Sequence, residues 1–387
     1  MHPRSATLLI AAVIACSGDA PDTGVVVRDS SGITIVENTA PVWPEGHGWR
    51  VAQESSLTIG VLEGPEEYQL FRVRSAIRLD DGRIVVANGG SSELRFYDAS
   101  GTLLTSVGGE GEGPGEFGRF MGAIWRAEGD SLVIYDYTNG MRLSVFDRNG
   151  TFGRAFRLEL PSTSIPLADA LIWGNTVVSR SGIYADGGRA DGLRRDSALY
   201  CTHDMDGTVF DTLGRFPGSE LYAQSMGEGT SVATSRPFGR QPQSAATAEY
   251  WYFGSGDRYE IRAYGRSGAL ARLIRRDVAN RPVSQAQMED IRVRAPGARR
   301  DIPIPETMPA YGRMLGDADG NMWVQEYRVA GEPERWAVLD PDGRFLGIVE
   351  MPAPGRVTEI GSDYVLGVWT DDMDVEQVRL YALSKNE

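Results

Sequence analysis

The chain has 387 residues, of which 41% are hydrophobic and 47 are glycine, and its formal net charge is −14. The length allows two or three ordinary domains or one large repeat domain, and the hydrophobic content is enough for a substantial core. The acidic balance excludes the positive electrostatic footprint on which nucleic-acid binding depends, and the glycine excess favours many tight turns over long helices.

The first residues have the pattern of an export signal. Arg4 precedes a short apolar run, residues 8–15, whereas a membrane-spanning helix takes about 20 apolar residues. The run ends in Val13-Ile14-Ala15-Cys16, which resembles a bacterial lipobox, whose cysteine is acylated and becomes the new N-terminus. We therefore expect a signal peptide over 1–15, a lipid anchor at Cys16 and a tether over 16–31. The alternative is an ordinary signal peptide with an unrelated cysteine.

A lipidated Cys16 predicts an extracytoplasmic protein of the cell envelope. Ser17 at the next position resembles the sorting signal of lipoproteins at the outer membrane or cell surface of diderm bacteria. The other cysteine is Cys201, so no intramolecular disulfide is available once Cys16 carries lipid. We interpret Cys201, in the alternating run 199–203, as a buried strand residue rather than a nucleophile.

The clearest structural unit of the chain is Arg83 to Phe117. It contains three short apolar or alternating runs, which we read as strands: 84–86, 94–97 and 103–107. The turn Asp98-Ala99-Ser100-Gly101 precedes the third run, because Asp caps backbone N–H groups and Gly accepts positive φ. Weaker copies of this unit recur through the chain. Ahead of the first copy, Gly32 to Asn38 predicts a strand along an outer edge.

One short strand lacks neighbours in its own part of the sequence. Leu57-Thr58-Ile59 and Thr105-Ser106-Val107 are each followed by a glycine, an acidic Gly-Pro loop, an aromatic residue and a new strand. Leu57-Thr58-Ile59 therefore looks like the last strand of a unit. The end of the chain supplies two strands, 364–366 and 378–381, and no final one. Pairing of 57–60 with this unit closes a ring and removes exposed sheet edges.

We therefore predict an all-β fold, a six-bladed β-propeller closed by an N-terminal strand, as a single domain over 32–387. The predicted blades are about 72–108, 117–158, 168–216, 245–275, 311–350, and 357–383 completed by 57–60. The exit GEGEGPGEF, the strand pair RIVVAN and ELRFYD, and the turn DASG resemble NHL-repeat and related six-bladed propeller proteins. That resemblance implies the fold and no single activity.

Three long segments are expected on the face of the ring opposite the short turns: 183–196, 214–247 and 276–310. Long loops on a rigid scaffold are where binding residues concentrate. Ser284 to Val293 predicts a short helix within the third. The basic residues of these segments indicate an anionic or polar ligand, unless they pair with nearby acidic residues. Our candidate ligand-binding residues here are Arg292, Arg294 and Arg299.

A second candidate set closes the second strand of each blade: Asn88, Asp136, Arg180, Ser255, Glu326 and Val368. We expect these positions to ring the mouth of the central channel. The ligand-binding candidates among them are Asn88, Asp136, Arg180 and Glu326. Asn, Asp and Glu oxygens suit a hard cation such as calcium. Related six-bladed enzymes of the gluconolactonase type hold a divalent cation by such oxygens at the channel mouth, although this sequence shares no motif with them beyond the predicted fold. The alternative is that these polar strand ends face water.

Signatures of other chemistry are missing from the sequence. The mature histidines, His47 and His203, lie far apart in the repeat, so a His-based zinc site or a Ser-His-Asp triad is hard to build. There is no G-x-S-x-G motif and no P-loop lysine. We expect a monomeric, lipid-anchored binding module for a peptide, glycan or protein, with no cofactor. The alternatives are a metal-dependent lactonase-like hydrolase or lyase at the channel mouth, and a subunit of an envelope assembly.

Overall fold

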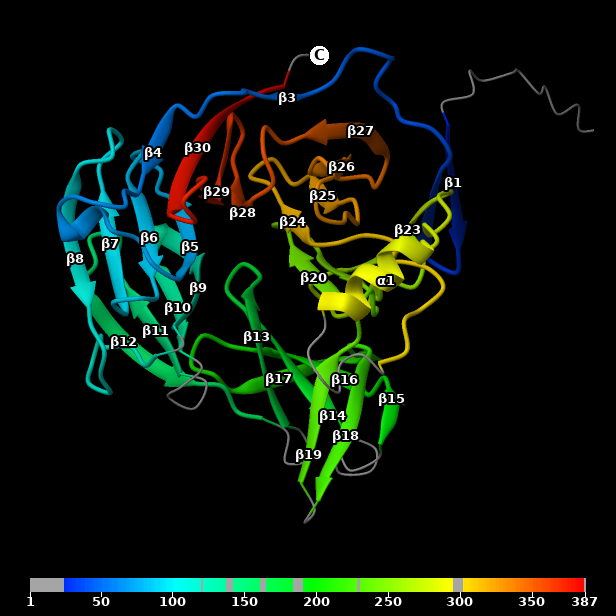
Figure 1. Cartoon of the computed structure of the whole chain (residues 1–387), viewed down its shortest axis with the longest axis horizontal. Coiled ribbons are helices and arrows are strands. Elements are labelled where there is room, and N and C mark those ends of the chain that lie inside the picture. Colours follow the sequence, from blue (N-terminus) through cyan, green and yellow to red (C-terminus); the bar gives the residue numbers. More distant parts are fainter. Residues whose placement is uncertain are drawn as a thin grey trace, which may run out of the picture.

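The computed structural model describes residues 24–119, 121–136, 142–160, 165–183, 191–227, 230–294 and 302–385. In these residues the all-β expectation is confirmed, because nearly every regular element is a strand. Six main sheets, each built mainly from strands of one stretch of the chain, are arranged around a common centre, with one smaller sheet beside them (Figure 1). The arrangement is propeller-like.

The first three sheets contain four antiparallel strands each. The first sheet is β5 (Val73–Arg78), β6 (Ile84–Asn88), β7 (Glu93–Tyr97) and β8 (Leu103–Gly108). The second is β9 (Met121–Arg126), β10 (Leu132–Asp136), β11 (Arg142–Phe146) and β12 (Phe152–Arg157). The third is β13 (Ile165–Ile172), β14 (Val177–Ile183), β16 (Ser197–His203) and β17 (Val209–Pro217).

The fourth and sixth sheets also include strands from the N-terminal part of the chain. The fourth is β20 (Gln243–Ala246), β21 (Trp251–Gly254), β22 (Glu260–Tyr264) and β23 (Leu270–Arg276), extended by β2 (Ile33–Asn38) and β1 (Val25–Ser30). The fifth is β24 (Met314–Gly316), β25 (Met322–Gln325), β26 (Arg335–Leu339) and β27 (Phe345–Glu350). The sixth is β28 (Arg356–Ile360), β29 (Tyr364–Thr370) and β30 (Glu376–Ser384), with β3 (Arg50–Val51) and β4 (Leu57–Ile59) both paired to β30.

The core lies between the sheets. Ile84, Val85, Val86 and Ala87 of β6 are all buried, as expected for a strand covered on both faces. Apolar clusters join the first sheet to the second, the second to the third, and so on through the fifth and sixth. A further cluster joins the sixth sheet to the first, and in it Ile59 of β4 packs with residues of β6 and β29. Each sheet is therefore stabilised mainly by its two neighbours.

The N-terminal segment follows the outer edges of three successive sheets (Figure 1). β2, the strand predicted over 32–38, lies parallel to β23 on the outer side of the fourth sheet, and β1 pairs with its other edge. Val42 N and Trp43 N then donate to Phe345 O and Leu346 O of β27. β4 finally pairs with β30, Ile59 lying opposite Val378 and Leu57 opposite Leu380. The segment thus links the fourth, fifth and sixth sheets by backbone hydrogen bonds.

The prediction of a tether over 16–31 is wrong in part. Residues 25–30 form β1, which is antiparallel to β2, because Val25-Val26-Val27 is a β-branched run that favours an extended strand. The signal peptide, Cys16 and the rest of the tether lie outside the described residues.

The turns use the mechanism expected from the sequence. Asp98 Oδ1 accepts hydrogen bonds from the N–H groups of Ser100 and Thr102, both at 2.9 Å, and Gly101 has φ of 88°. The same pattern recurs at Asp147, Asp204 and Asp340. Because strand direction alternates, these turns lie at one end of the sheets and the connections between sheets lie at the other. We call the second end the insertion face.

Two insertions give that face its name. β15 (Gly192–Arg194), β18 (Leu221–Gly227) and β19 (Thr230–Ser235) form a small sheet from the first two long segments, which the sequence did not predict. The predicted helix is α1 (Gln285–Arg294). Ser284 Oγ accepts from Gln287 N at 3.2 Å, and Gln287 Oε1 accepts from Ser284 N at 2.9 Å, a reciprocal capping box. Two 3₁₀ turns complete the elements: η1 (Glu66–Tyr68) and η2 (Glu128–Asp130).

None of the described helices has the length and apolar character needed to cross a membrane.

A buried Ser–His pair lies inside the third sheet. His203 Nε2 is 2.7 Å from Ser179 Oγ, and its Nδ1 is 3.2 Å from Gly207 O. The carbonyl requires Nδ1 to carry the proton, so Nε2 accepts from the serine hydroxyl. Both side chains are buried, which makes the pair a structural tie to the turn at Gly207 rather than a nucleophile. Burial lowers the pKa of His203.

This pKa shift predicts a loss of stability in mild acid. Below the ordinary histidine pKa of about 6.5 the unfolded chain takes up a proton that folded His203 resists. The free energy of unfolding should therefore fall as pH drops from 6.5 towards 5.5, by no more than about 1.4 kcal/mol per pH unit for one proton. Urea unfolding at several pH values gives the free energy of unfolding as a function of pH. The slope of this plot should be shallower for His203→Gln than for the wild type, whereas His47→Gln, at an exposed position, should keep the wild-type slope. Equal slopes for all three proteins would contradict the assignment.

Candidate functional site

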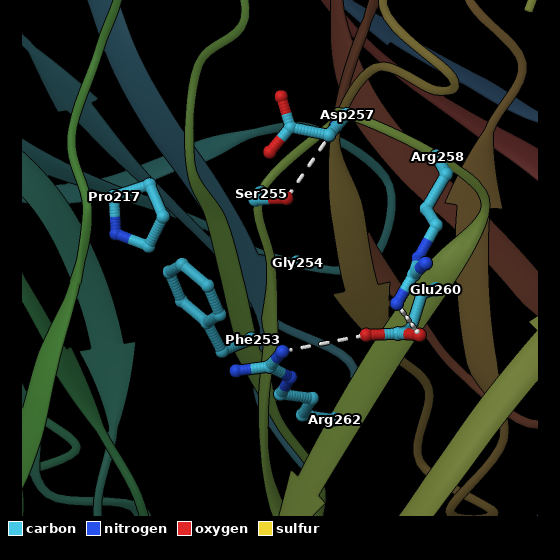
Figure 2. Close-up of a pocket in the computed structure, with 8 residues that line it drawn as sticks. All are labelled: Pro217, Phe253, Gly254, Ser255, Asp257, Arg258, Glu260 and Arg262. Atoms are coloured by element: carbon cyan, nitrogen blue, oxygen red, sulfur yellow. Dashed lines mark hydrogen bonds and ion pairs between the residues drawn. The ribbon is translucent and has the colours of Figure 1, made fainter. Parts of the chain in front are cut away.

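A pocket of about 320 Å³ lies on the insertion face between the third and fourth sheets (Figure 2). Its residues come from the end of β17, the end of β21, the connection that follows, and β22. They are Pro217, Phe253, Gly254, Ser255, Asp257, Arg258, Glu260 and Arg262. The pocket therefore joins two neighbouring sheets.

The alternation of β22 places its charged side chains in this pocket. Arg258, Glu260 and Arg262 are two residues apart and share one side of the extended chain. Tyr259 and Ile261 point to the other side, where they are buried against the fifth sheet. Packing on one side of β22 thus fixes the charged residues on the other.

Glu260 organises the electrostatics of the pocket. Its carboxylate is 8% exposed and lies 2.6 Å from Arg258 Nη2, 3.4 Å from Arg262 Nη2 and 3.0 Å from Arg275 Nε. Burial alone would raise the pKa of Glu260, but the hydrogen bond from Arg275 and the charges of Arg258 and Arg262 outweigh burial and lower it. Arg275 also contacts Glu37 at 3.2 Å. Three guanidinium groups therefore surround the Glu260 carboxylate, while the pocket lining itself contains two arginines and two carboxylates, Glu260 and Asp257.

The pocket has one apolar side and one charged side. Figure 2 shows the Pro217 and Phe253 rings next to each other, with Arg258 and Arg262 converging on Glu260. The Arg258 and Arg262 side chains keep 70% and 44% of their surface exposed, so both guanidinium groups remain accessible. Such a surface can bind a ligand that combines an oxyanion with an apolar or ring-shaped part.

The long segment before β16 also contributes to the rim. Arg195 Nη1 lies 2.6 Å from Asp257 Oδ1, and its Nη2 donates to Ser255 O at 2.8 Å. Ser255 Oγ accepts from Asp257 N at 3.4 Å. One residue of the predicted channel-mouth set, Ser255, is thus part of this pocket.

The other members of that set lie in different surroundings. Asn88 is buried at the end of β6, where Oδ1 accepts from Phe71 N at 2.9 Å and Nδ2 donates to Ser91 Oγ at 2.8 Å. It lines a cleft of about 630 Å³ between the first and sixth sheets, together with Glu376. Arg180 lines a smaller cavity, about 150 Å³, in the third sheet.

Asp136 and Glu326 differ sharply in exposure. Asp136 is fully buried, accepts from Gly118 N at 2.9 Å, and pairs with Arg142 Nη2 at 3.2 Å. The Glu326 side chain is 39% exposed and is 4.0 Å from Arg276 Nη1. Val368 is buried. None of the five cavities described in the structure is lined by two of the four ligand-binding candidates.

Carboxylates, histidines and cysteines do not gather into a metal-like group. Within the part of the chain that the structure describes, no three of them are arranged to hold an ion. Cys201 is buried, as interpreted from its strand.

Several arginines of the long segments have acidic partners. Arg194 pairs with Asp196 at 2.6 Å, and Arg281 pairs with Glu332 at 2.9 Å. For these residues the alternative of ion pairing holds. Arg292 is exposed on α1, Arg294 is its last residue, and Arg299 lies outside the described residues.

The sequence analysis missed Arg258, Glu260 and Arg262 as site residues. Their signal was present in Arg258-Tyr259-Glu260-Ile261-Arg262, since charges that alternate with apolar residues mark a strand with one charged face. The sequence does not show that the third sheet lies beside this face, where its residue Pro217 completes the pocket.

Comparison with known proteins supports the fold alone. No protein-family model and no curated protein matches the chain. Among solved structures, a Bacteroides fragilis protein named "Putative exported protein" matches at 11% identity and a TM-score of 0.50, over 91% of this chain and 100% of that one. The PQQ-bound aldose sugar dehydrogenase of Streptomyces coelicolor matches at 12% identity and a TM-score of 0.44, over 87% and 98%. Virginiamycin B lyase of Staphylococcus aureus matches at 10% and 0.37, over 81% and 95%.

Proposed function

We propose that this chain is a lipid-anchored, extracytoplasmic six-bladed β-propeller of the NHL-repeat type, and that it binds a peptide, glycan or protein ligand on its insertion face. Contacts between the innermost strands support the proposal of a ring. Each of these strands contacts the next in the order β5, β9, β13, β20, β24 and β28, and β28 contacts β5. The pairing of β4 with β30 supports closure by the N-terminal segment.

The location outside the cytoplasm rests on the N-terminal pattern. A charged start, a short apolar run and Cys16 in the lipobox position are the features that export and lipidation require. The name of the Bacteroides fragilis protein of similar fold points the same way. Mass spectrometry of the protein purified from membranes tests the anchor, since a diacyl modification at Cys16 and the loss of residues 1–15 are expected.

The observation that carries the binding role is the accessible basic rim of the pocket in Figure 2. A chain of net charge −14 places three arginines around Glu260 on one edge of this pocket, beside the Pro217–Phe253 side. Two of these guanidinium groups keep free surface, so they can donate to a ligand without losing their carboxylate partner. We therefore expect the ligand to carry a carboxylate, sulfate or phosphate group.

Replacing both Arg258 and Arg262 by alanine should weaken ligand binding at least about tenfold, because hydrogen bonds to charged groups contribute about 1.5–3 kcal/mol each. Glycan and peptide arrays probed with the soluble domain supply the ligand, and titration of the strongest hit measures the affinity. Arg335→Ala is the matched control, since Arg335 is similarly exposed and ion-paired on the fifth sheet. Arg292→Ala tests whether α1 contributes.

Two outcomes would remove this pocket from the proposal. One is an array with no hit above background for the wild-type protein. The other is a hit whose affinity is the same in the double variant as in Arg335→Ala.

The alternative function is a metal-dependent hydrolase or lyase. It requires a bound divalent cation, which metal analysis of the purified protein measures directly.

A further inference from the structure

A separate cavity of about 370 Å³ lies among the innermost strands, which Figure 1 shows towards the middle of the ring. It is bounded by β9, β13, β20 and β24, from four consecutive sheets. Each of these strands is an edge strand of its own sheet, so the N–H and C=O groups on one side of its backbone pair with no other strand of that sheet. The cavity shares no lining residue with the insertion-face pocket.

Most residues that line this lumen cavity are apolar, but its exposed surface is at least as polar as apolar, because the lining includes polar side chains and free backbone edges of the strands. Trp125 of β9 and Leu171 of β13 are half-buried lining residues that also pack against the neighbouring inter-sheet cores, and the Met314 side chain is buried in the core between the fourth and fifth sheets. Gln243 and Ser244 of β20 add polar groups. Arg313 is the single charged residue in the lining. A volume in this range suits a small ligand.

Arg313 lies in the cavity without a carboxylate partner. Among the described residues its guanidinium makes one hydrogen bond, from Nη1 to Val357 O at 3.0 Å, and no ion pair. The acidic residue whose charge acts on Arg313 is Glu334. Its carboxylate already accepts hydrogen bonds from the side chains of Gln325 and Trp336 and from Gly355 N. Burial lowers the pKa of Arg313, and the neighbouring charge of Arg356 lowers it further.

Arg356 adds a second positive group close by. Its guanidinium donates to the backbone carbonyls of Val73 and Arg74 on β5, and among the described residues it has no ion pair. Burial lowers the pKa of Arg356 as well, with Arg74 contributing and Glu376 opposing. A guanidinium held in a partly dry site without an anion is costly, and a bound anion offsets that cost.

We propose that the lumen cavity binds a small monocarboxylate, whose carboxylate pairs with Arg313 and whose remaining part lies beside Trp125 and Leu171. The planar guanidinium can bind a carboxylate through two parallel hydrogen bonds. This site is independent of the ligand proposed for the insertion face.

The test uses octanoate as the probe and 1-octanol as its neutral counterpart, with the mature soluble domain. Isothermal titration should detect octanoate binding, and octanol should bind at least about tenfold more weakly, because it lacks the charge-assisted hydrogen bonds. Arg313→Met keeps the apolar stem and removes the charge, so it should weaken octanoate binding by about the same factor. Arg335→Ala should bind octanoate like the wild type.

Thermal unfolding without ligand separates this role from a structural one. If Arg313 serves a ligand, Arg313→Met should unfold at the wild-type temperature or above, since an unpaired charge has left a partly buried site. If Arg313 instead serves to tie β24 to β28 through Val357, the variant should unfold earlier and octanoate affinity should not change. That second result overturns the proposal, as does equal binding of octanoate and octanol by the wild type, which needs no variant to fold.

Discussion

Ile59→Ala is expected to lower the free energy of unfolding by about 3 kcal/mol, within the range for large-to-small changes in a packed core. Ile59 is 2% exposed and packs between the sixth and first sheets. The loss should exceed that of an ordinary edge-strand substitution, because β4 pairs with β30 and so joins the two ends of the chain.

The neighbouring residue provides a matched control. Thr58 lies opposite Arg379 in the same strand pair, but its side chain is exposed. Thr58→Ala should therefore change stability by about 0.5 kcal/mol or less. Urea unfolding followed by tryptophan fluorescence measures both. Similar losses for the two variants, or none for Ile59→Ala, would mean that β4 contributes little to the packing of the first and sixth sheets.

Asp136→Ala should destabilise the protein by about 3–5 kcal/mol, because it leaves the Arg142 guanidinium buried without its carboxylate. Asp136 has no exposed side-chain surface, and Arg142 has 11%. Arg142 also donates to the carbonyls of Glu112 and Glu116, so this pair holds the acidic glycine-rich loop that leads into the second sheet.

Glu326→Ala is the matched comparison, since both residues belong to the set predicted to close the second strands. Its partner lies 4.0 Å away and its side chain is partly exposed, so the expected loss is below about 1 kcal/mol. Thermal and urea unfolding of the two variants give the comparison. Equal small effects would show that Asp136 is free of a structural role and would return it to the ligand-binding candidates.

The contrast between these two residues shows where the sequence analysis reached its limit. The repeat identified where strands end, and a polar residue at a strand end is visible in the sequence. Whether that residue faces solvent, a cavity or a buried arginine depends on the loop that folds over it. Asn88 and Asp136 are both covered by backbone N–H donors from the loops that precede their own sheets, at Phe71 and Gly118.

The N-terminal segment shows the same limit at the level of strands. The sequence indicated a strand at 32–38 and an unpaired strand at 57–59, and the structure has both. The sequence analysis missed β1 and assigned its residues to the tether, because six residues between polar neighbours resemble a tether until a partner strand is present. β-strands are stable only through their neighbours, so edge strands are the least visible in the sequence alone.

By itself, the amino-acid sequence determined the strand periodicity, the Asp-Gly turns and the all-β character, because each depends on residues only a few positions apart. The tertiary structure decided the surroundings of individual side chains: Arg258 and Arg262 line a pocket, Arg313 lines the lumen cavity, and Asp136 is out of reach of solvent. Those outcomes depend on the sheet that lies alongside, and burial and charge compensation are set by contacts between residues that are distant in the chain.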